Sequence, residues 1–233
     1  MPEPVILGWS GGKDSTLALH ELRRDARYAV VTLLTTVTES YDRISIHGVR
    51  RSLLYQQTAS LGIPLREVVI PTDCPNDEYE RRIAAALEDL RAQTPGLNSV
   101  AFGDLFLEDI RRYRERMLAS DGMRGLFPVW GRDTAALARE FLTLGYKAIV
   151  VCVDTTALPR DFAGAEFDEA FLDALPPGVD PCGENGEFHT FVYAGPMFAQ
   201  PIPCRRGDLV LRDGRWAYCD LEEQDVRRQA SDV

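Results

Sequence analysis

The chain lacks closely spaced cysteines. Its five cysteines are scattered along 233 residues, so the C-x-x-C spacing of zinc sites and redox-active thiols is absent. An odd number of isolated cysteines also provides no disulfide framework. We therefore expect free thiols and a reducing compartment.

Long apolar runs are absent as well. Hydrophobic residues make up 45% of the sequence, yet no run approaches the ~20 residues that a membrane-spanning helix requires. Residues 1–4 (Met-Pro-Glu-Pro) lack the basic start and the apolar segment of a signal peptide. We therefore expect a cytoplasmic protein that has no membrane partner.

The chain has fewer basic than acidic residues. The chain has 36 acidic and 26 basic residues and a formal net charge of −10. A nucleic-acid binder usually needs a basic surface that displaces counterions from phosphates. We therefore expect no bulk nucleic-acid partner, although the sequence leaves a local basic patch open. Only Lys13 and Lys147 are lysines.

Apolar runs alternate with amphipathic stretches up to residue 154, which predicts an α/β fold with a parallel, doubly wound sheet. The expected strands are 5–7, 28–37, 65–70, 99–105, 125–129 and 147–153. The expected helices are 14–22, 49–61, 76–93, 107–119 and 134–144.

Prolines interrupt this pattern after Asp154. One helix (166–175) and three strands (188–193, 208–212 and 215–220) are expected there, the last two joined by an Asp-Gly turn. We therefore predict two domains, 1–154 and a smaller, β-containing C-terminal region, 155–233. The charged tail from Glu222 is expected to fray.

The segment Ser10–Ser15 (Ser-Gly-Gly-Lys-Asp-Ser) joins the first strand to the first helix. Backbone N–H groups in the first turn of a helix have no intrahelical partner and attract anions. Gly11 and Gly12 carry no Cβ atom that would keep the backbone away from a phosphate. Such a loop predicts a phosphate site.

The other side chains of this loop fit the same chemistry. Ser10 and Ser15 add hydroxyl donors, and Lys13 adds a positive charge. Asp14 is a candidate Mg²⁺ ligand. The alternative is an ordinary Gly-Gly turn that Asp14 or Ser15 caps.

Two common phosphate-loop patterns do not fit the segment. Asp14 follows the lysine where the Walker pattern requires Ser or Thr, and adjacent glycines exclude G-x-G-x-x-G. The pattern S-G-G-x-D-S resembles instead the pyrophosphate loop of the ATP pyrophosphatases, which cleave ATP between its α and β phosphates. This resemblance implies a sheet of the adenine-nucleotide alpha hydrolase (HUP-like) type.

A second glycine, Gly103, precedes Asp104 at the end of the expected strand 99–105. Ligands of open parallel sheets bind beyond the carboxyl ends of the strands. We therefore predict that Gly103 and Asp104 contact the nucleotide. A plain strand-ending turn is the alternative.

Residues 180–192, followed by Gly-Pro-Met-Phe at 195–198, resemble the C-terminal signature of the diphthine–ammonia ligase family, G-E-x-G-E-F-x-T followed by P-x-F. Other segments resemble the family in the same order. The first of these segments comprises Ile46–Arg50, Gln57 and residues 61–65. The second runs from residues 101–104 through 114–115 to 127–132. The resemblance spans residues 5–200.

The resemblance implies an ATP-dependent amide ligase. A carboxylate attacks the α-phosphorus of ATP, pyrophosphate leaves, and ammonia displaces AMP from the acyl-adenylate. Ser10, Gly11, Gly12 and Ser15 would hold the β and γ phosphates, Lys13 would neutralise pyrophosphate, and Asp14 would position Mg²⁺. A small-molecule or protein-borne carboxylate and ammonia are the implied partners.

The acceptor side of the site is also implied by the resemblance. Glu184, Glu187 and His189 are the candidate catalytic residues there, facing the nucleotide across the cleft and serving the acceptor or ammonia. The candidate substrate-binding residues are His47, Arg50, Asn185 and Thr190. The alternative for the two glutamates is a solvated surface turn, and His20, within the first helix, is interpreted as structural.

One residue departs from the family pattern. Members that amidate diphthine carry glutamate in G-E-F-E-T, whereas this chain has His189. Histidine can donate or accept a proton near neutral pH, so the departure leaves the acceptor open. The alternatives are a cobalamin precursor, a tRNA base, or a non-catalytic nucleotide-binding module. A homo-oligomer also stays open.

Overall fold

The computed structural model describes residues 1–45 and 47–224, in which a parallel sheet carries the first half of the chain. Its main strands have the order β4 (Leu65–Ile70), β2 (Tyr28–Thr38), β1 (Glu3–Gly8), β5 (Ser99–Ala101) and β6 (Arg124–Leu126). All four pairings between these neighbours are parallel. The short β3 (Arg43–Ile44) pairs antiparallel with the end of β2. Strand order therefore reverses at β1, between β2 and β5.

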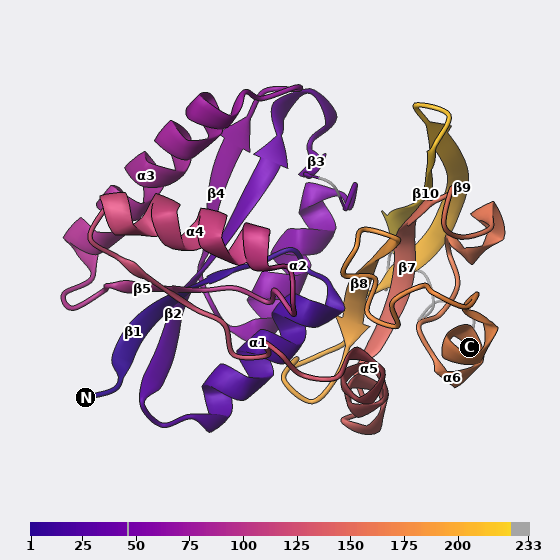
Figure 1. Cartoon of the computed structure of the whole chain (residues 1–233), viewed down its shortest axis with the longest axis horizontal. Coiled ribbons are helices and arrows are strands. Elements are labelled where there is room, and N and C mark those ends of the chain that lie inside the picture. The colour runs from indigo at the N-terminus through magenta and orange to yellow at the C-terminus, as the bar shows by residue number, and fades with distance from the viewer. Residues whose placement is uncertain (46, 225–233) are drawn as a thin grey trace, which may run out of the picture.

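Helices cover both faces of this sheet (Figure 1). Alternation of side chains along β1 sends Ile6 into one apolar cluster and Val5 and Leu7 into another, as a strand period of two requires. The Ile6 cluster includes residues of α3 (Asn76–Gln93) and α4 (Glu108–Ser120). The other includes residues of α1 (Lys13–Arg24) and α2 (Arg51–Leu61). The expected doubly wound α/β fold is confirmed.

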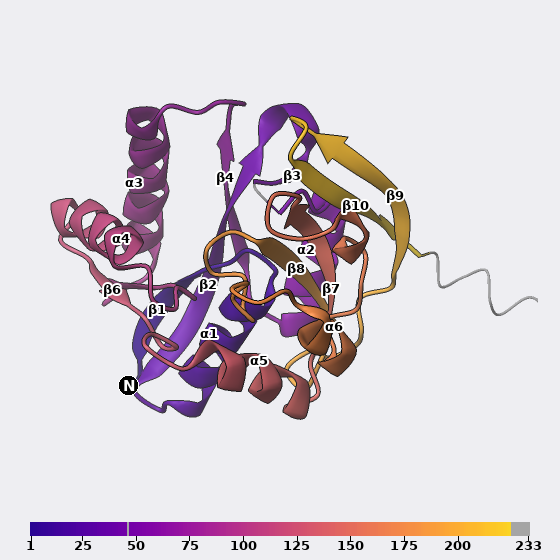
Figure 2. The ribbon, with the colours of Figure 1, turned by 45° about the vertical axis from the view of Figure 1, so that its right-hand side comes forward.

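The second half of the chain forms an antiparallel sheet of order β8 (Phe188–Ala194), β7 (Lys147–Asp154), β10 (Trp216–Glu223) and β9 (Cys204–Arg212). It lies on the α1 and α2 side of the first sheet (Figure 2). Strand β8 contacts α1. The loop before β8 therefore lies close to the start of α1.

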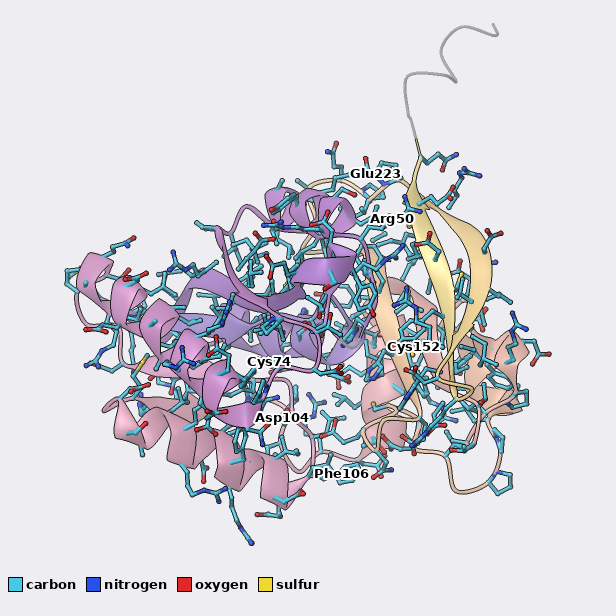
Figure 3. The ribbon with its side chains drawn as sticks, turned by 90° about the horizontal axis from the view of Figure 1, so that it is seen from above. Arg50, Cys74, Asp104, Phe106, Cys152 and Glu223 are labelled. Carbon is cyan, nitrogen blue, oxygen red and sulfur yellow. The ribbon has the colours of Figure 1, made fainter. Side chains whose placement is uncertain are left out.

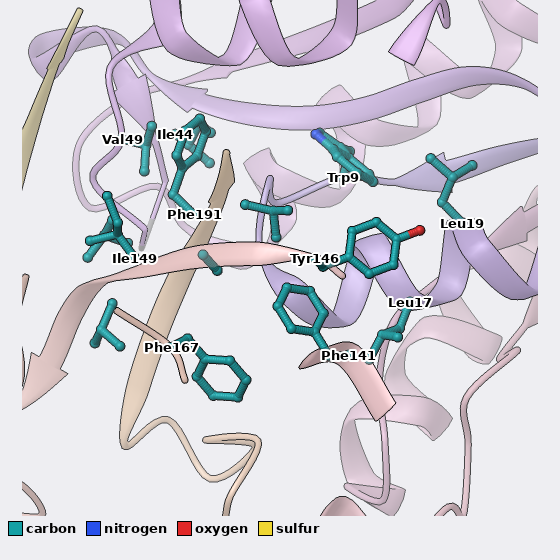
Figure 4. Close-up of a cluster of buried hydrophobic side chains, with 14 of the residues drawn as sticks. Trp9, Leu17, Leu19, Ile44, Val49, Phe141, Tyr146, Ile149, Phe167 and Phe191 are labelled. Atoms are coloured by element: carbon teal, nitrogen blue, oxygen red, sulfur yellow. The ribbon is translucent and has the colours of Figure 1, made fainter. Parts of the chain in front are cut away.

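A shared core joins the second sheet to the first (Figure 4). Phe141 of α5 (Thr134–Thr143) stacks on Tyr146 with ring centroids 5.2 Å apart. The same cluster contains Trp9 and Leu17 from the first half and Phe191 from β8. Burial of these large apolar side chains stabilises the packing of the two halves.

Strand β7 belongs to the second sheet, although we expected residues 147–153 among the elements of the first domain. Seven of its eight residues are buried, so its apolar pattern is that of a strand in a parallel sheet. The periodicity of apolar residues does not distinguish a fully buried strand of the first, parallel sheet from one of the second, antiparallel sheet. The second sheet thus begins before residue 154.

Other boundaries differ by a few residues. β5 ends at Ala101, which leaves Gly103 and Asp104 in a loop, α6 (Glu169–Ala174) begins after residue 166, and β9 begins before residue 208. Two 3₁₀ helices are Glu39–Tyr41 (η1) and Arg160–Phe162 (η2). Glu222 lies within β10, whereas the rest of the expected fraying tail, 225–233, and Ile46 lie outside the described residues. Within the described residues, no helix is long and apolar enough to cross a membrane.

Candidate functional site

A cavity of about 340 Å³ lies where strand order reverses, beyond the carboxyl ends of β1 and β5. This is the position at which open α/β sheets bind ligands. The cavity is lined by predicted site residues from both halves of the chain, namely Ser10, Lys13, Asp14, Ser15, His47, Gly103, Asp104, Glu184, His189 and Thr190. Residues up to 180 positions apart therefore meet at one site.

The Ser10–Ser15 loop has the geometry of an anion cradle. Gly11 has a φ of 77°, which favours glycine, and α1 begins directly after Gly12. The Ser10 and Ser15 hydroxyl oxygens are 3.2 Å apart, and the amide of Gly12 donates to the Ser10 hydroxyl. First-turn amides and two hydroxyls thus converge on one end of the cavity.

Gln57 and strand β8 fix this loop from behind. The Gln57 amide nitrogen donates to the carbonyls of Gly11 (3.0 Å) and Val192 (2.7 Å), and its oxygen accepts from Trp9 Nε1 (2.8 Å). The amide of Val192 also donates to the Gly11 carbonyl. Sequence analysis included Gln57 in a segment that resembles the family but did not place it among the site residues, because a glutamine in an amphipathic helix does not by itself predict full burial. The second sheet therefore helps to hold the loop.

Lys13 connects the loop to the segment before β8. Its backbone amide donates to the Thr190 hydroxyl (3.0 Å), and its Nζ donates to Asp14 (2.9 Å) and to the Cys182 carbonyl. Burial disfavours the ammonium charge, but the neighbouring acidic groups, Asp14 first and Asp180 among them, together outweigh burial and raise the pKa of Lys13. Lys13 is therefore a charged side chain held beside the cavity.

Gly103 lies tightly against the start of α1. A Cβ at this position would lie 2.7 Å from the Asp14 carbonyl carbon, which excludes any larger residue without rearrangement. Asp104 forms a bidentate ion pair with Arg114, at 2.5 and 3.0 Å, and the Arg114 guanidinium lies over the Phe102 ring. Arg114, which also lines the cavity, was not predicted, because arginines recur throughout α4.

Glu184 also lines the cavity. Its Oε1 accepts from the amides of Leu105 (2.7 Å) and Phe106 (3.4 Å), just beyond β5. Burial raises the pKa of Glu184 to about 7, against the opposing effect of the hydrogen bond from Leu105. A carboxylate with this pKa can exchange a proton near neutral pH.

Glu187 has a different position from Glu184. It is 8% exposed and is absent from the cavity lining. Its Oε1 accepts from the amide of Asp180 and from the side chain of Asn185, both at 3.0 Å. Asp180 in turn accepts from the amide of Glu184 (2.9 Å). Glu187 therefore braces the loop that carries Glu184, while Asn185 is exposed and also lies outside the cavity lining.

His47 and His189 stand together on the cavity wall, with ring centroids 4.6 Å apart. His47 Nδ1 lies 3.3 Å from the Thr190 carbonyl oxygen, which can only accept, so Nδ1 is the donor and Nε2 is left as an acceptor. Burial lowers the pKa of His47 to about 4 and holds the pKa of His189 well below its usual range. The pair is neutral at physiological pH.

Arg50 is not brought to the cavity. Its guanidinium pairs with Asp220 of β10 at 2.5 Å, and Figure 3 shows it near Glu223, apart from Asp104 and Phe106. His20 bonds the Tyr146 hydroxyl at 2.9 Å, in keeping with its structural interpretation. Among the described residues, no group of three or more His, Cys, Asp and Glu side chains could hold a metal ion.

An open parallel sheet with a glycine loop at its strand reversal is typical of α/β proteins that bind phosphate-bearing ligands. Comparison with known families narrows the class. The N-terminal domain model of diphthamide synthase matches residues 4–125, and the C-terminal domain model matches residues 133–225. The chain therefore belongs to the diphthamide synthase family, as the resemblance predicted.

Individual relatives agree with this assignment. The chain is 27% identical over 250 residues to the diphthine–ammonia ligase of Mus musculus, covering 96% of this chain and 92% of the relative. It is 28% identical over 213 residues to that of Danio rerio, covering 83% of each. The names of these relatives indicate a ligase.

Proposed function

We propose that this protein is an ATP-dependent ligase that converts a carboxylate into an acyl-adenylate and aminates it with ammonia. The observation that carries the proposal is that side chains of the Ser10–Ser15 loop and Glu184 line the same cavity. A loop suited to phosphate thus shares a cavity with a carboxylate that can exchange a proton at neutral pH. The relatives named diphthine–ammonia ligase support this chemistry.

In the first half-reaction, the acceptor carboxylate attacks the α-phosphorus of ATP, and the bond to the bridging oxygen breaks to release pyrophosphate. First-turn amides of α1 and the Ser10 and Ser15 hydroxyls bind the outer phosphates. Lys13 offsets the charge that develops on the leaving pyrophosphate. Such a site acts by positioning and electrostatics.

Mg²⁺ fits this donor set as an ion that arrives with the nucleotide. Mg²⁺ is usually held by one or two carboxylates together with phosphate oxygens and water, and Asp14 offers such a carboxylate on the cavity wall. Bound there, the ion would neutralise phosphate charge. Lys13, which donates to both Asp14 oxygens, holds that carboxylate in place.

In the second half-reaction, ammonia attacks the acyl carbon, the carbon–oxygen bond to AMP breaks, and nitrogen gives up a proton. Glu184 takes this proton in its ionised form. The neutral His47 and His189 add hydrogen-bonding groups without adding positive charge that would repel an ammonium ion. Neither His47 nor His189 identifies the acceptor.

The direct test follows both half-reactions with ATP, Mg²⁺, ammonium and a panel of carboxylic acids. We expect equimolar AMP and pyrophosphate, and exchange of labelled pyrophosphate into ATP that needs the acid but not ammonium. Formation of ADP, or AMP release that no carboxylic acid and no ammonium stimulates, would overturn the proposal.

A further inference from the structure

A second cavity, of about 620 Å³, opens beside the first. It is bordered by Tyr41 of η1, by Asp73 after β4 and by the turn between β9 and β10. In Figure 2, the tip of the β9–β10 hairpin lies beside the ends of β2 and β3. Ile44 and Ser45 line both cavities. The two cavities therefore adjoin at the end of β3.

Arg212 is a distinctive side chain of the second cavity. Its guanidinium lies over the rings of Tyr41 (4.9 Å) and Tyr218 (5.5 Å). Within residues 1–45 and 47–224, no carboxylate lies within 4.0 Å of it. Stacking on aromatic rings fixes the guanidinium plane and leaves its edge to bind a carboxylate or phosphate with two hydrogen bonds.

The other charged groups around this cavity leave Arg212 uncompensated. Arg43 is held by Asp220 at 2.7 Å and donates to the Gly48 carbonyl, so its guanidinium is already engaged. Asp73 and Asp213 are exposed at the rim, where water screens them. The cavity thus offers one anion-binding group, and its acidic rim tolerates a cationic substituent nearby.

We propose that the second cavity is the acceptor subsite, and that Arg212 binds an anionic group of the acceptor that is not the one being amidated. This inference rests on the proposed ligase function. A carboxylate loses its charge when it becomes an acyl-adenylate, so an arginine that holds the acceptor throughout must bind another group. The substrate class is therefore a carboxylic acid with a second acidic group, a carboxylate or a phosphate.

The sizes of the two cavities support this division. Ligand sites usually span roughly 300–1,000 Å³, so the first cavity, at about 340 Å³, has little space beyond a nucleotide. Gly48, with a φ of 69°, packs so closely on Tyr218 that a Cβ would lie 2.8 Å from the ring. This contact holds the segment after β3 against β10 and fixes one wall of the second cavity.

The test measures anion binding by the whole protein loaded with Mg²⁺ and α,β-methylene ATP, which cannot release pyrophosphate. Succinate, butyrate and inorganic phosphate are titrated separately by calorimetry. We expect saturable binding of succinate or phosphate at millimolar concentration or below, with butyrate at least tenfold weaker. R212Q should raise the dissociation constant at least tenfold, and R212K should recover part of the loss. R205Q is the matched control on β9, outside the cavity lining, and should change it less than twofold.

The outcomes separate this inference from the ligase proposal. Loading with α,β-methylene ATP tests the nucleotide site alone, and R212Q should leave that affinity unchanged. If the analogue binds but neither succinate nor phosphate does, or if R212Q and R205Q weaken anion binding equally, the acceptor subsite is wrong while the nucleotide site stands. A mono-acid that is amidated as efficiently as any di-acid, with no effect of R212Q, would overturn it equally.

Discussion

The Ser10–Ser15 loop and the segment 180–187 before β8, called here the acidic loop, both line the first cavity, but they supply different kinds of groups to it. The first presents backbone amides and two hydroxyls at the start of α1. The second presents one side chain, Glu184, on a loop that Asp180 and Glu187 brace from within. The spacing of glycines in the sequence predicts a site that is built from backbone groups. A site that is built from side chains also depends on the direction in which each side chain points, which the sequence does not give.

The largest effect is expected from a substitution in the Ser10–Ser15 loop, D14N. D14N keeps a hydrogen-bond acceptor for Lys13 but removes the negative charge beside the phosphate cradle. We expect AMP formation to fall by about 10³-fold, the scale of losing a preorganised electrostatic group. D14N also removes the charge partner of the buried Lys13, so the melting temperature should fall, and activity is compared at a temperature at which the variant stays folded. D109N, an exposed substitution in the first turn of α4, is the control. Unchanged AMP formation in D14N would remove Asp14 from the mechanism.

The acceptor side is tested by Glu184. E184Q keeps the size of the side chain but cannot accept a proton, so amide formation should fall by about 10²-fold with nucleotide affinity unchanged. The pKa of about 7 sets the pH dependence: the base is active when ionised, so kcat/KM should fall as pH decreases below 7. His47, with a pKa of about 4, should not titrate in this range. A pH profile of E184Q that matches the native protein would contradict this role.

Glu187 tests whether a residue of the acidic loop can act by supporting Glu184 rather than by taking part in the reaction. In E187Q the side chain must still accept from Asp180 and Asn185 while it buries a new amide group. We expect a loss of about 1–3 kcal/mol in the free energy of unfolding, the cost of a poorly satisfied buried polar group. Activity should fall less than in E184Q. Thermal and urea unfolding measure the first effect, and an E187Q protein of native stability but without amide formation would make Glu187 catalytic.

The sequence predicted much of this molecule because several of its signals are local. Strand–loop–helix alternation predicted the doubly wound sheet, and the Ser10–Ser15 glycines predicted a loop at the start of α1, which the structure places beside the first cavity. The sheet to which β7 belongs was not predictable, because burial on both faces gives the same apolar run in either sheet. Gln57 was missed as a site residue because its partner Val192 is 135 positions away in the chain. Arg114 was missed although its partner Asp104 is only 10 positions away, because neither the end of a strand nor a helix rich in arginine predicts that ion pair.

The smallest expected effect concerns two arginines with different partners. Arg50 is paired with Asp220, which Arg43 also contacts, so in R50Q the carboxylate keeps one cationic partner. Partly exposed ion pairs of this kind contribute about 0–1 kcal/mol. We therefore expect R50Q to change the unfolding free energy by less than about 1 kcal/mol and the acceptor KM by less than twofold, whereas R212Q should raise that KM at least tenfold. Steady-state kinetics with the best di-acid of the panel measures both variants. A tenfold rise of KM in R50Q would restore the substrate-binding role predicted for Arg50 and place the acceptor beside Arg50, which neither cavity includes in its lining.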